Sequence, residues 1–277
     1  MLLASLLGRT TAKGRVALVV AHPDDETIAA GGSLHLLPDL LLVHVTDGAP
    51  RGLGDVERAG FATPAAYAAA RRVELHAALA VAGATPDMVE LLIPDQDASL
   101  HMPGITARLA ALLDAHGVTA VLTHAYEGGH PDHDATAFCV AHAAAGRELV
   151  EFPAYHAGPN GELRNGCFLP LLPPGEGRDK GVAAPILAGT VPRRPHPDPL
   201  PGGEGEAALS PAEQFRKRRM IACFQTQSAF LQHFSTTVEP FRSAIPDFTR
   251  PPHPGLLNYE RWQWPMTGAR WRELARC

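Results

Sequence analysis

Short, nearly continuous apolar runs recur along the first 155 residues of the chain, and segments with helical character separate them. Runs of this kind are typical of strands that are buried on both faces of a parallel sheet. The pattern predicts strands at residues 15–21, 40–46, 88–93, 118–124 and 149–155. It predicts helices at residues 27–37, 64–83, 105–117 and 134–146.

The regular alternation of strands and helices predicts an α/β fold. We expect a Rossmann-like, doubly wound and mainly parallel sheet with helices on both faces. A closed barrel of eight strand–helix units would need more repeats than the sequence contains. The helix at 64–83 has the clearest signals, because Pro64 suits a first turn and Gly83 suits a helix end.

The alternation breaks after Tyr155. Residues 170–209 are dense in Pro and Gly and lack periodic apolar positions, so we expect a flexible insertion or a long surface loop there. A Pro-rich segment that binds a partner is the alternative. A helix is expected to resume after Ser210, with Glu213 at its third position. The aromatic tail from Phe230 is expected to pack back onto the sheet and to shape one side of a cleft.

Composition argues against several classes of protein. The 277 residues carry a formal charge of −5 and are 45% hydrophobic, which is ordinary for a globular core and argues against nucleic-acid binding. The four cysteines form no CxxC pair, so a disulfide framework or a thiolate zinc site is not expected. No apolar stretch approaches the roughly 20 residues that span a bilayer. We therefore expect a soluble, cytoplasmic protein, and the sequence leaves a homo-oligomer open.

The triplet His-Pro-Asp occurs three times, in three different settings. The triplet at 22–24 follows the first strand, and the triplet at 130–132 follows the fourth strand after a short Gly-containing loop. The third, at 196–198, lies in the Pro/Gly-rich segment without a strand before it, and we interpret it as loop. In a doubly wound sheet the first and fourth strands are neighbours at the switch point, where ligands bind. The first two motifs are therefore predicted to converge.

Histidine with carboxylate and no thiolate suits a catalytic Zn²⁺ with an open position for water, and Fe²⁺ could use the same ligands. Spacing suggests His22 with Asp24 or Asp25 from the first motif, and His130 or His133 from the second. The aspartate that does not bind the metal would approach the water as a base. The alternative is that both motifs are helix starts, where acidic residues complement the helix dipole.

The segments "AHPDDE" and "EGGHPDHD" resemble the PIG-L (LmbE-like) family, and "RRVEL", "PDQDA" and the "EPFR…PPHPG…YE" tail extend the resemblance over most of the chain. The resemblance implies a single deacetylase domain over 1–277 and a zinc-dependent removal of acetyl from N-acetylglucosaminyl groups on lipids, thiols or antibiotics. The roles that it implies are zinc ligands at His22, Asp25 and His133, a general base at Asp24, an oxyanion-stabilising histidine at His130, an acid that orients it at Asp132, and substrate contact by Arg71.

Several residues have weaker signals. Asp95 follows the third strand and could bind sugar hydroxyls, or it could be a turn residue after Pro94. Glu26 is expected to start a helix or to support the site from behind. His44 has no carboxylate at ligand spacing and is expected to be a packed or surface histidine. The run Arg216–Arg219 is expected to be a solvated helix face.

The sequence therefore favours a zinc-dependent hydrolase that removes acetyl from an N-acetylated amino sugar conjugate. The alternatives are an amidase that acts on another acyl-amino-sugar or thiol conjugate, and a carbohydrate-binding module without catalysis. Loss of one acid or base from the set at 24, 130 and 132 would favour the binding module, but all three residues are present.

Overall fold

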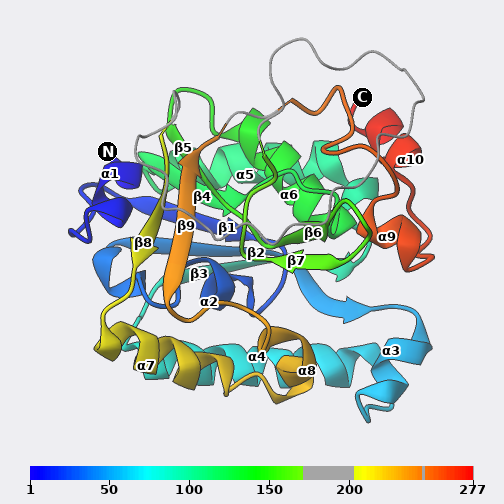
Figure 1. Ribbon diagram of the computed structural model, residues 1–277, viewed down its shortest axis with the longest axis horizontal. Helices are drawn as coiled ribbons and strands as arrows, with labels where there is room; N and C mark the ends of the chain where they lie inside the picture. Colours follow the sequence, from blue (N-terminus) through cyan, green and yellow to red (C-terminus); the bar gives the residue numbers. More distant parts are fainter. Residues whose placement is uncertain (171–202, 245–246, 277) are drawn as a thin grey trace.

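A seven-stranded sheet with helices on both faces organises the protein, as the sequence predicts (Figure 1). The computed structural model describes residues 1–170, 203–244 and 247–276. The strand order is β3-β2-β1-β4-β5-β9-β8, and the hairpin strands β6 and β7 form a separate small sheet. The strands are β1 (Val16–Val20), β2 (Leu40–Pro50), β3 (Asp87–Asp95), β4 (Ala120–His124), β5 (Glu148–Phe152), β6 (Tyr155–Ala157), β7 (Leu163–Asn165), β8 (Glu204–Ala208) and β9 (Val238–Ser243).

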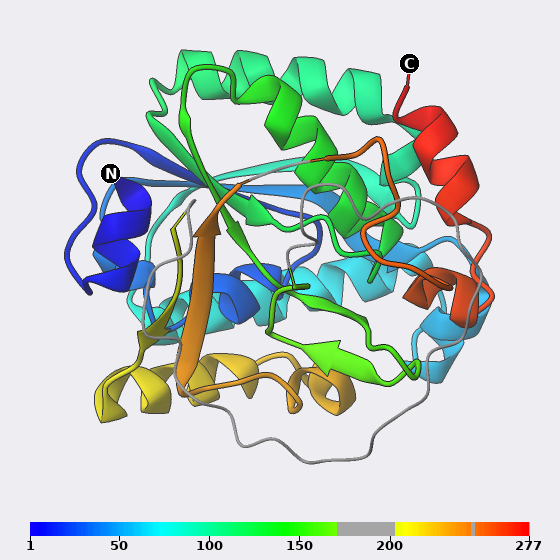
Figure 2. The same cartoon turned by 45° about the horizontal axis from the view of Figure 1, so that its top comes forward.

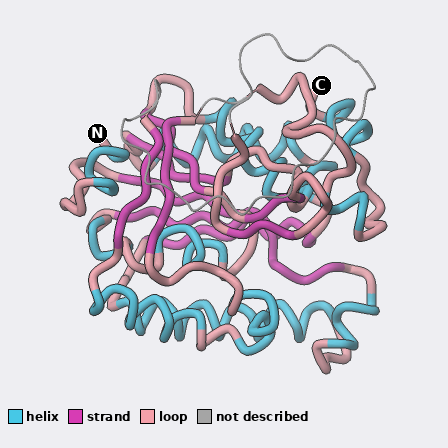
Figure 3. The backbone as a smooth tube through the Cα atoms, viewed as in Figure 1, coloured by secondary structure: helices cyan, strands magenta, loops and turns pink. Residues whose placement is uncertain are grey.

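Helices connect the strands and cover the sheet, as the backbone trace in Figure 3 shows. The α-helices are α1 (Leu2–Leu7), α2 (Asp25–Ala30), α3 (Leu53–Arg58), α4 (Pro64–Ala82), α5 (Met102–Ala115), α6 (Pro131–Ala143), α7 (Pro211–Ile221), α8 (Ser228–Leu231), α9 (Asn258–Arg261) and α10 (Gly268–Leu274). Short 3₁₀ turns lie at Leu34–Leu36, Ala98–Leu100 and Gln225–Gln227.

The five predicted strands are all present and pair in parallel, with β1 between β2 and β4. Val16 lies beside Leu40 on one side and beside Ala120 on the other. This pairing confirms the predicted neighbourhood of the first and fourth strands. It brings the carboxyl ends of β1 and β4 to the same edge of the sheet.

The sheet ends in two antiparallel strands that the sequence pattern does not predict. β9 pairs with β5, and β8 pairs with β9. β8 falls inside the predicted insertion at 170–209, so the sheet resumes by Glu204 and the predicted boundary is too late. Ala207 is the buried residue of β8, because an edge strand has little to bury. Residues 171–202, including the third His-Pro-Asp triplet, lie outside the described residues.

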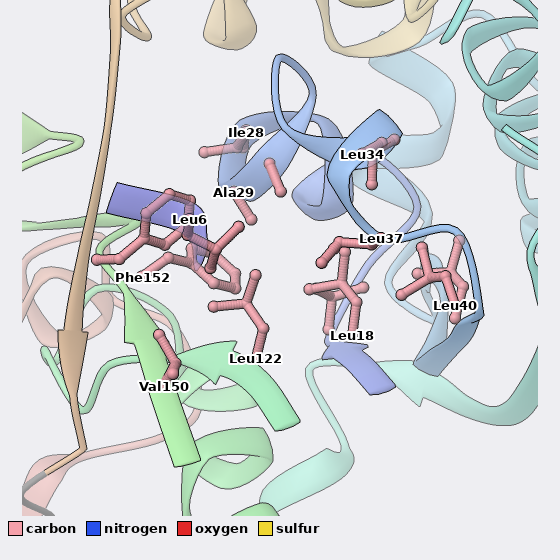
Figure 4. Packing of buried hydrophobic residues seen from close by; sticks show 14 of the residues in the cluster. Leu6, Leu18, Ile28, Ala29, Leu34, Leu37, Leu40, Leu122, Val150 and Phe152 are labelled. Carbon is pink, nitrogen blue, oxygen red and sulfur yellow. The ribbon is translucent and has the colours of Figure 1, made fainter. Parts of the chain in front are cut away.

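Alternate residues of β1 face two different cores. Leu18 and Val20 belong to a cluster with residues of α2 and α4, and Ala17 and Val19 belong to a cluster with residues of α5, α6 and α10. Figure 4 shows Leu18 beside Leu37 in the first cluster, with Ile28 and Leu122 among its other members. Figure 2 shows α10 on the same side of the sheet as α5 and α6. Because both faces of the sheet are buried, the ends of β1 and β4, which lead into the two motifs, are held in place.

A buried ion pair attaches α7 to β9, and the same lysine contacts α2. Lys217 is 1% exposed, and its Nζ donates to Glu239 at 2.8 Å and to the carbonyl oxygen of Ile28 at 2.9 Å. Glu239 also accepts from the backbone N–H of Gly32 at 2.7 Å. The interpretation of 216–219 as a wholly solvated face is therefore wrong at this position, since Lys217 faces inward between residues that face solvent.

Replacing Lys217 by Met should lower the free energy of unfolding by about 3–5 kcal/mol, because it leaves the Glu239 carboxylate buried without its cation. Urea unfolding followed by circular dichroism measures this change. Arg218→Met is the matched control, since Arg218 is the exposed neighbour on the same helix, and it should change stability by less than about 0.5 kcal/mol. Equal losses in the two variants would contradict the assignment of Lys217 to the core.

Candidate metal centre

The two motifs meet at the carboxyl edge of the sheet, as predicted. The first motif follows β1 and leads into α2, and the second follows β4 and leads into α6. His130 is the N-cap of α6 and Pro131 occupies the first turn, so α6 begins three residues before the predicted helix. Both helices therefore start at the site, which puts their motif side chains next to each other.

Three buried side chains from the two motifs form a candidate metal-binding group: His22, Asp25 and His133. The Nδ1 atom of His22 lies 3.2 Å from Nε2 of His133 and 3.3 Å from Oδ2 of Asp25. Oδ1 of Asp25 lies 3.4 Å from Nε2 of His133. Donor atoms that surround an ion tetrahedrally at about 2.0–2.1 Å stand about 3.3–3.4 Å apart. The spacing of these atoms fits one such ion, and the candidate group contains Asp25 and not Asp24.

His124, the last residue of β4, supports this group and is not singled out by the sequence. Its ring stacks on His133 with centroids 4.1 Å apart, and its Nε2 lies 3.3 Å from Oδ2 of Asp25. The backbone N–H of Ala21 donates to the same nitrogen, and burial together with His133 lowers the pKa of His124 to about 3. A neutral His124 packs against the ligands. In the sequence, the signal that could have identified His124 was its position at the end of a strand, shortly before the second motif.

Asp24 lies beside the ligand group but has a different partner. The Nη2 atom of Arg71 donates to Oδ2 of Asp24 at 2.8 Å. Burial raises the pKa of Asp24 to about 8, against the lowering effect of the Arg71 guanidinium. A cation bound next to Asp24 would favour its ionised form. The side chain also lines the neighbouring cavity, so it is open to a ligand there.

Arg71 is 4% exposed, and its two terminal nitrogens are engaged by the protein. Nη1 donates to the carbonyl oxygen of Gly48 at 2.6 Å, and Nη2 donates to that of Pro23 at 2.8 Å in addition to Asp24. A side chain at Gly48 would meet this guanidinium at 2.7 Å. These contacts orient Asp24, and the predicted contact of Arg71 with substrate stays a prediction.

The orientation of His130 by the Asp132 carboxylate stays a prediction. The Asp132 carboxylate accepts from the backbone N–H groups of Gln96 and Ala98 and lies 3.4 Å from Nε2 of His22. Its own N–H donates to Nδ1 of His130 at 3.1 Å. Burial and the neighbouring His22 lower the pKa of His130 well below its usual range. Because Nδ1 accepts the Asp132 N–H, the proton of a neutral His130 lies on Nε2, where it can donate a hydrogen bond.

Asp95 lies between the two histidines. Its Oδ1 is 3.2 Å from Nε2 of His22 and 3.6 Å from Nε2 of His130. Burial alone would raise the pKa of Asp95, but these imidazoles and Arg71 hold it below its usual range. Asp95 and Asp132 thus face the outer nitrogen of His22, the position from which a carboxylate orients a metal-binding histidine. Sugar binding by Asp95 stays a prediction.

A cavity of about 740 Å³ opens above the ligand group. The residues that line it include Tyr67, Gln96, Tyr155, Trp262 and Trp264. The ring of Trp264 meets His130 edge to face at 4.7 Å, which fixes the wall next to the site. Trp262 and Trp264 belong to the aromatic tail, so the prediction that this tail shapes one side of a cleft is confirmed.

Comparison with known proteins gives a consistent picture. Residues 17–144 match the PIG-L family model, described as GlcNAc-PI de-N-acetylase. No curated protein matches the chain. Among the described residues, helices long and apolar enough to cross a membrane are absent.

Solved structures of similar fold include deacetylases and one hydratase. The A40926 pseudoaglycone deacetylase Dbv21 is 18% identical with a TM-score of 0.56, over 84% of this chain and 98% of that chain. The zinc-inhibited form of teicoplanin deacetylase Orf2 is 15% identical with a TM-score of 0.55, over 83% and 97%. GalB, the 4-carboxy-2-hydroxymuconate hydratase from Pseudomonas putida KT2440, is 17% identical with a TM-score of 0.51, over 86% and 99%. At these identities the likeness establishes the shared fold.

The family match runs from β1 to the end of α6, so it contains both motifs, the whole ligand group and Asp24, Asp95 and His130. The fold around this segment is that of the deacetylase structures. A segment of the chain, residues 17–144, is therefore similar to the PIG-L family.

Proposed function

We propose that this protein is a zinc-dependent hydrolase that removes the acetyl group from an N-acetylated amino sugar conjugate. The observation that carries the proposal is the juxtaposition of Asp24 with the ligand group His22, Asp25 and His133 at the floor of one cavity. The family match and the deacetylase neighbours support the same reaction. The cytoplasmic location and the oligomeric state stay predictions from the sequence.

The proposed roles follow from what each side chain contacts. A divalent ion in this ligand set supplies a Lewis acid that polarises the amide and activates water. Asp24 takes the proton from the attacking water and returns it to the nitrogen of the departing amine. His130 donates from Nε2 to the carbonyl oxygen as that oxygen gains negative charge. The products are acetate and the free amino sugar.

Zinc is the metal that we propose, because two imidazoles and one carboxylate without thiolate form a common catalytic zinc set. Fe²⁺ accepts the same donors. The Orf2 structure is of a zinc-inhibited form of that deacetylase, so the metal that supports activity has to be measured for this protein. Metal analysis of the purified protein, followed by reconstitution with Zn²⁺ or Fe²⁺ after chelation, decides between them.

Acetate release from a panel of N-acetyl amino sugar conjugates tests the reaction. Stoichiometric acetate and free amine support the proposal. Release of a larger acid would favour the amidase alternative, and binding without any turnover would favour a carbohydrate-binding module. Because GalB shares the fold, the panel should include unsaturated carboxylic acids, where water addition without acetate would indicate a hydratase.

Replacing Trp262 by Ala should raise KM about 10-fold and change kcat by less than about 3-fold, because a stacking wall contributes roughly 1–1.5 kcal/mol of uniform binding. Trp262 lines the cavity and is 41% exposed, so the ring is available to a substrate. Initial-rate kinetics measures KM and kcat separately. Leu256→Ala is the control, since Leu256 is exposed on the same tail but does not line the cavity. A fall in kcat at constant KM would contradict a role for Trp262 in binding.

A further inference from the structure

The carboxylate of Glu26 lies behind the metal centre and has no part in the proposed reaction. Its Oε2 accepts from the backbone N–H of Asp24 at 3.0 Å and lies 3.3 Å from Nε2 of His44. Its Oε1 accepts from the hydroxyl of Thr27 at 2.7 Å. Glu26 and His44 are both 0% exposed, so these contacts are shielded from water. Because these contacts hold the Glu26 carboxylate in place, they also hold the backbone N–H of Asp24 in its position.

The backbone of Asp24 needs such support. Its φ of 132° and ψ of −26° lie in a region that residues with a side chain rarely adopt. Conformations of this kind persist only where surrounding groups hold them, and they concentrate at functional sites. The side chains of two residues hold the backbone of Asp24 in this conformation. Glu26 accepts the N–H of Asp24, and Arg71 donates to the carbonyl oxygen of Pro23 and to the Asp24 carboxylate.

The strained turn separates two adjacent acids. Both aspartates line the cavity, but Asp25 contributes to the ligand group, whereas Asp24 pairs with Arg71. Release of the Asp24 amide would let the turn relax toward an ordinary conformation and would move its carboxylate. We propose that Glu26, backed by His44, is a positioning residue that holds Asp24 out of the ligand group and directed to the cavity. The catalytic consequence rests on the proposed function, but the structural role does not.

Variants Glu26→Ala and Glu26→Gln test the proposal in the full-length, zinc-loaded protein. Gln keeps one oxygen acceptor for the Asp24 amide, whereas Ala keeps none. Glu239→Gln is the matched control, because Glu239 is also 0% exposed and accepts a backbone N–H at the other end of α2. It should lower stability without altering Asp24, so it separates positioning from general loss of stability.

The first measurement follows the Asp24 amide by NMR with selectively labelled aspartate. The proton of this amide, bonded to a carboxylate, should resonate downfield in the wild-type protein, shift upfield in Glu26→Ala and exchange at least about 10-fold faster. Glu26→Gln should be intermediate, and Glu239→Gln should match the wild type. An Asp24 amide that is unchanged in Glu26→Ala would overturn the proposal, and if that variant does not fold, an unchanged amide in Glu26→Gln would do so.

The second measurement is steady-state kinetics. Glu26→Ala should lower kcat on the order of 100-fold, since displacement of a catalytic group by about 1 Å has this effect. KM and zinc content should stay within about 2-fold of the wild-type values. The value of kcat should fall from the wild type to Glu26→Gln and again to Glu26→Ala. A loss of kcat in Glu239→Gln as large as in Glu26→Gln would overturn positioning. If the wild type releases no acetate from any conjugate, the proposed function fails, and the amide measurement still decides the role of Glu26.

Discussion

Replacing Asp24 by Asn should lower kcat for acetate release by about 10²–10⁴-fold, the range that a general base contributes. The amide of Asn cannot take a proton from water at neutral pH, so the step that generates the nucleophile is lost. Asn keeps an oxygen that can accept from Arg71, whose Nη2 donates to Asp24 at 2.8 Å. The fold around Arg71 should therefore remain intact. Initial-rate acetate assays measure the change.

Zinc content distinguishes this outcome from damage to the metal centre. Asp24 is not part of the ligand group, so Asp24→Asn should retain the metal of the wild type. Asp47→Asn is a suitable control, because Asp47 is an aspartate near the end of β2 that pairs with the surface residue Arg51. It should keep wild-type activity. Full activity in Asp24→Asn would remove Asp24 from the role of base, and loss of zinc would reassign it to the ligands.

Replacing His133 by Ala should remove both the metal and the activity. The Nε2 atom of His133 stands 3.2 Å and 3.4 Å from the other two donor residues, so its loss leaves two protein ligands for the ion. We expect at least a 100-fold loss of zinc affinity, more than the 10–100-fold that loss of an outer partner of a ligand causes. Competition with a fluorescent chelator measures the affinity, and elemental analysis measures the content.

The matched control for His133 is on the same helix. His142 lies on α6, is exposed, and packs its ring against Phe138. His142→Ala should keep zinc and activity at wild-type values. Wild-type zinc content in His133→Ala would show that the ion uses another donor set, for which His22, Asp95, His130 and Asp132 are the alternative group in the described structure.

The sequence predicted the central sheet well because the strands of this sheet are buried on both faces. β1, β2 and β4 are continuous apolar runs, so their positions can be read without knowledge of their partners. Their order followed from the connection rules of doubly wound sheets. β8 and β9 could not be predicted in the same way. β8 is an edge strand in which Ala207 alone is buried, and both strands pair with partners that are distant in the sequence.

Contacts between distant segments explain the other differences. Lys217 looks like a solvated charge within its basic run, and only the packing of α7 against β9 and α2 supplies Glu239 and the Ile28 carbonyl. The resemblance implied that Asp132 orients His130, a role that stays a prediction. In the structure the Asp132 carboxylate accepts from two backbone N–H groups that follow β3.

By itself the sequence determined the α/β architecture, the convergence of the two motifs and the donor types of a metal site, because burial, connection rules and residue chemistry act locally. The tertiary structure decided which atoms meet. It brought Asp25 into the candidate ligand group with donor spacings of 3.2–3.4 Å, and it added His124 and His44 to Glu26 behind the site. These choices depend on backbone angles and cross-strand neighbours, which a linear pattern of residue types does not encode.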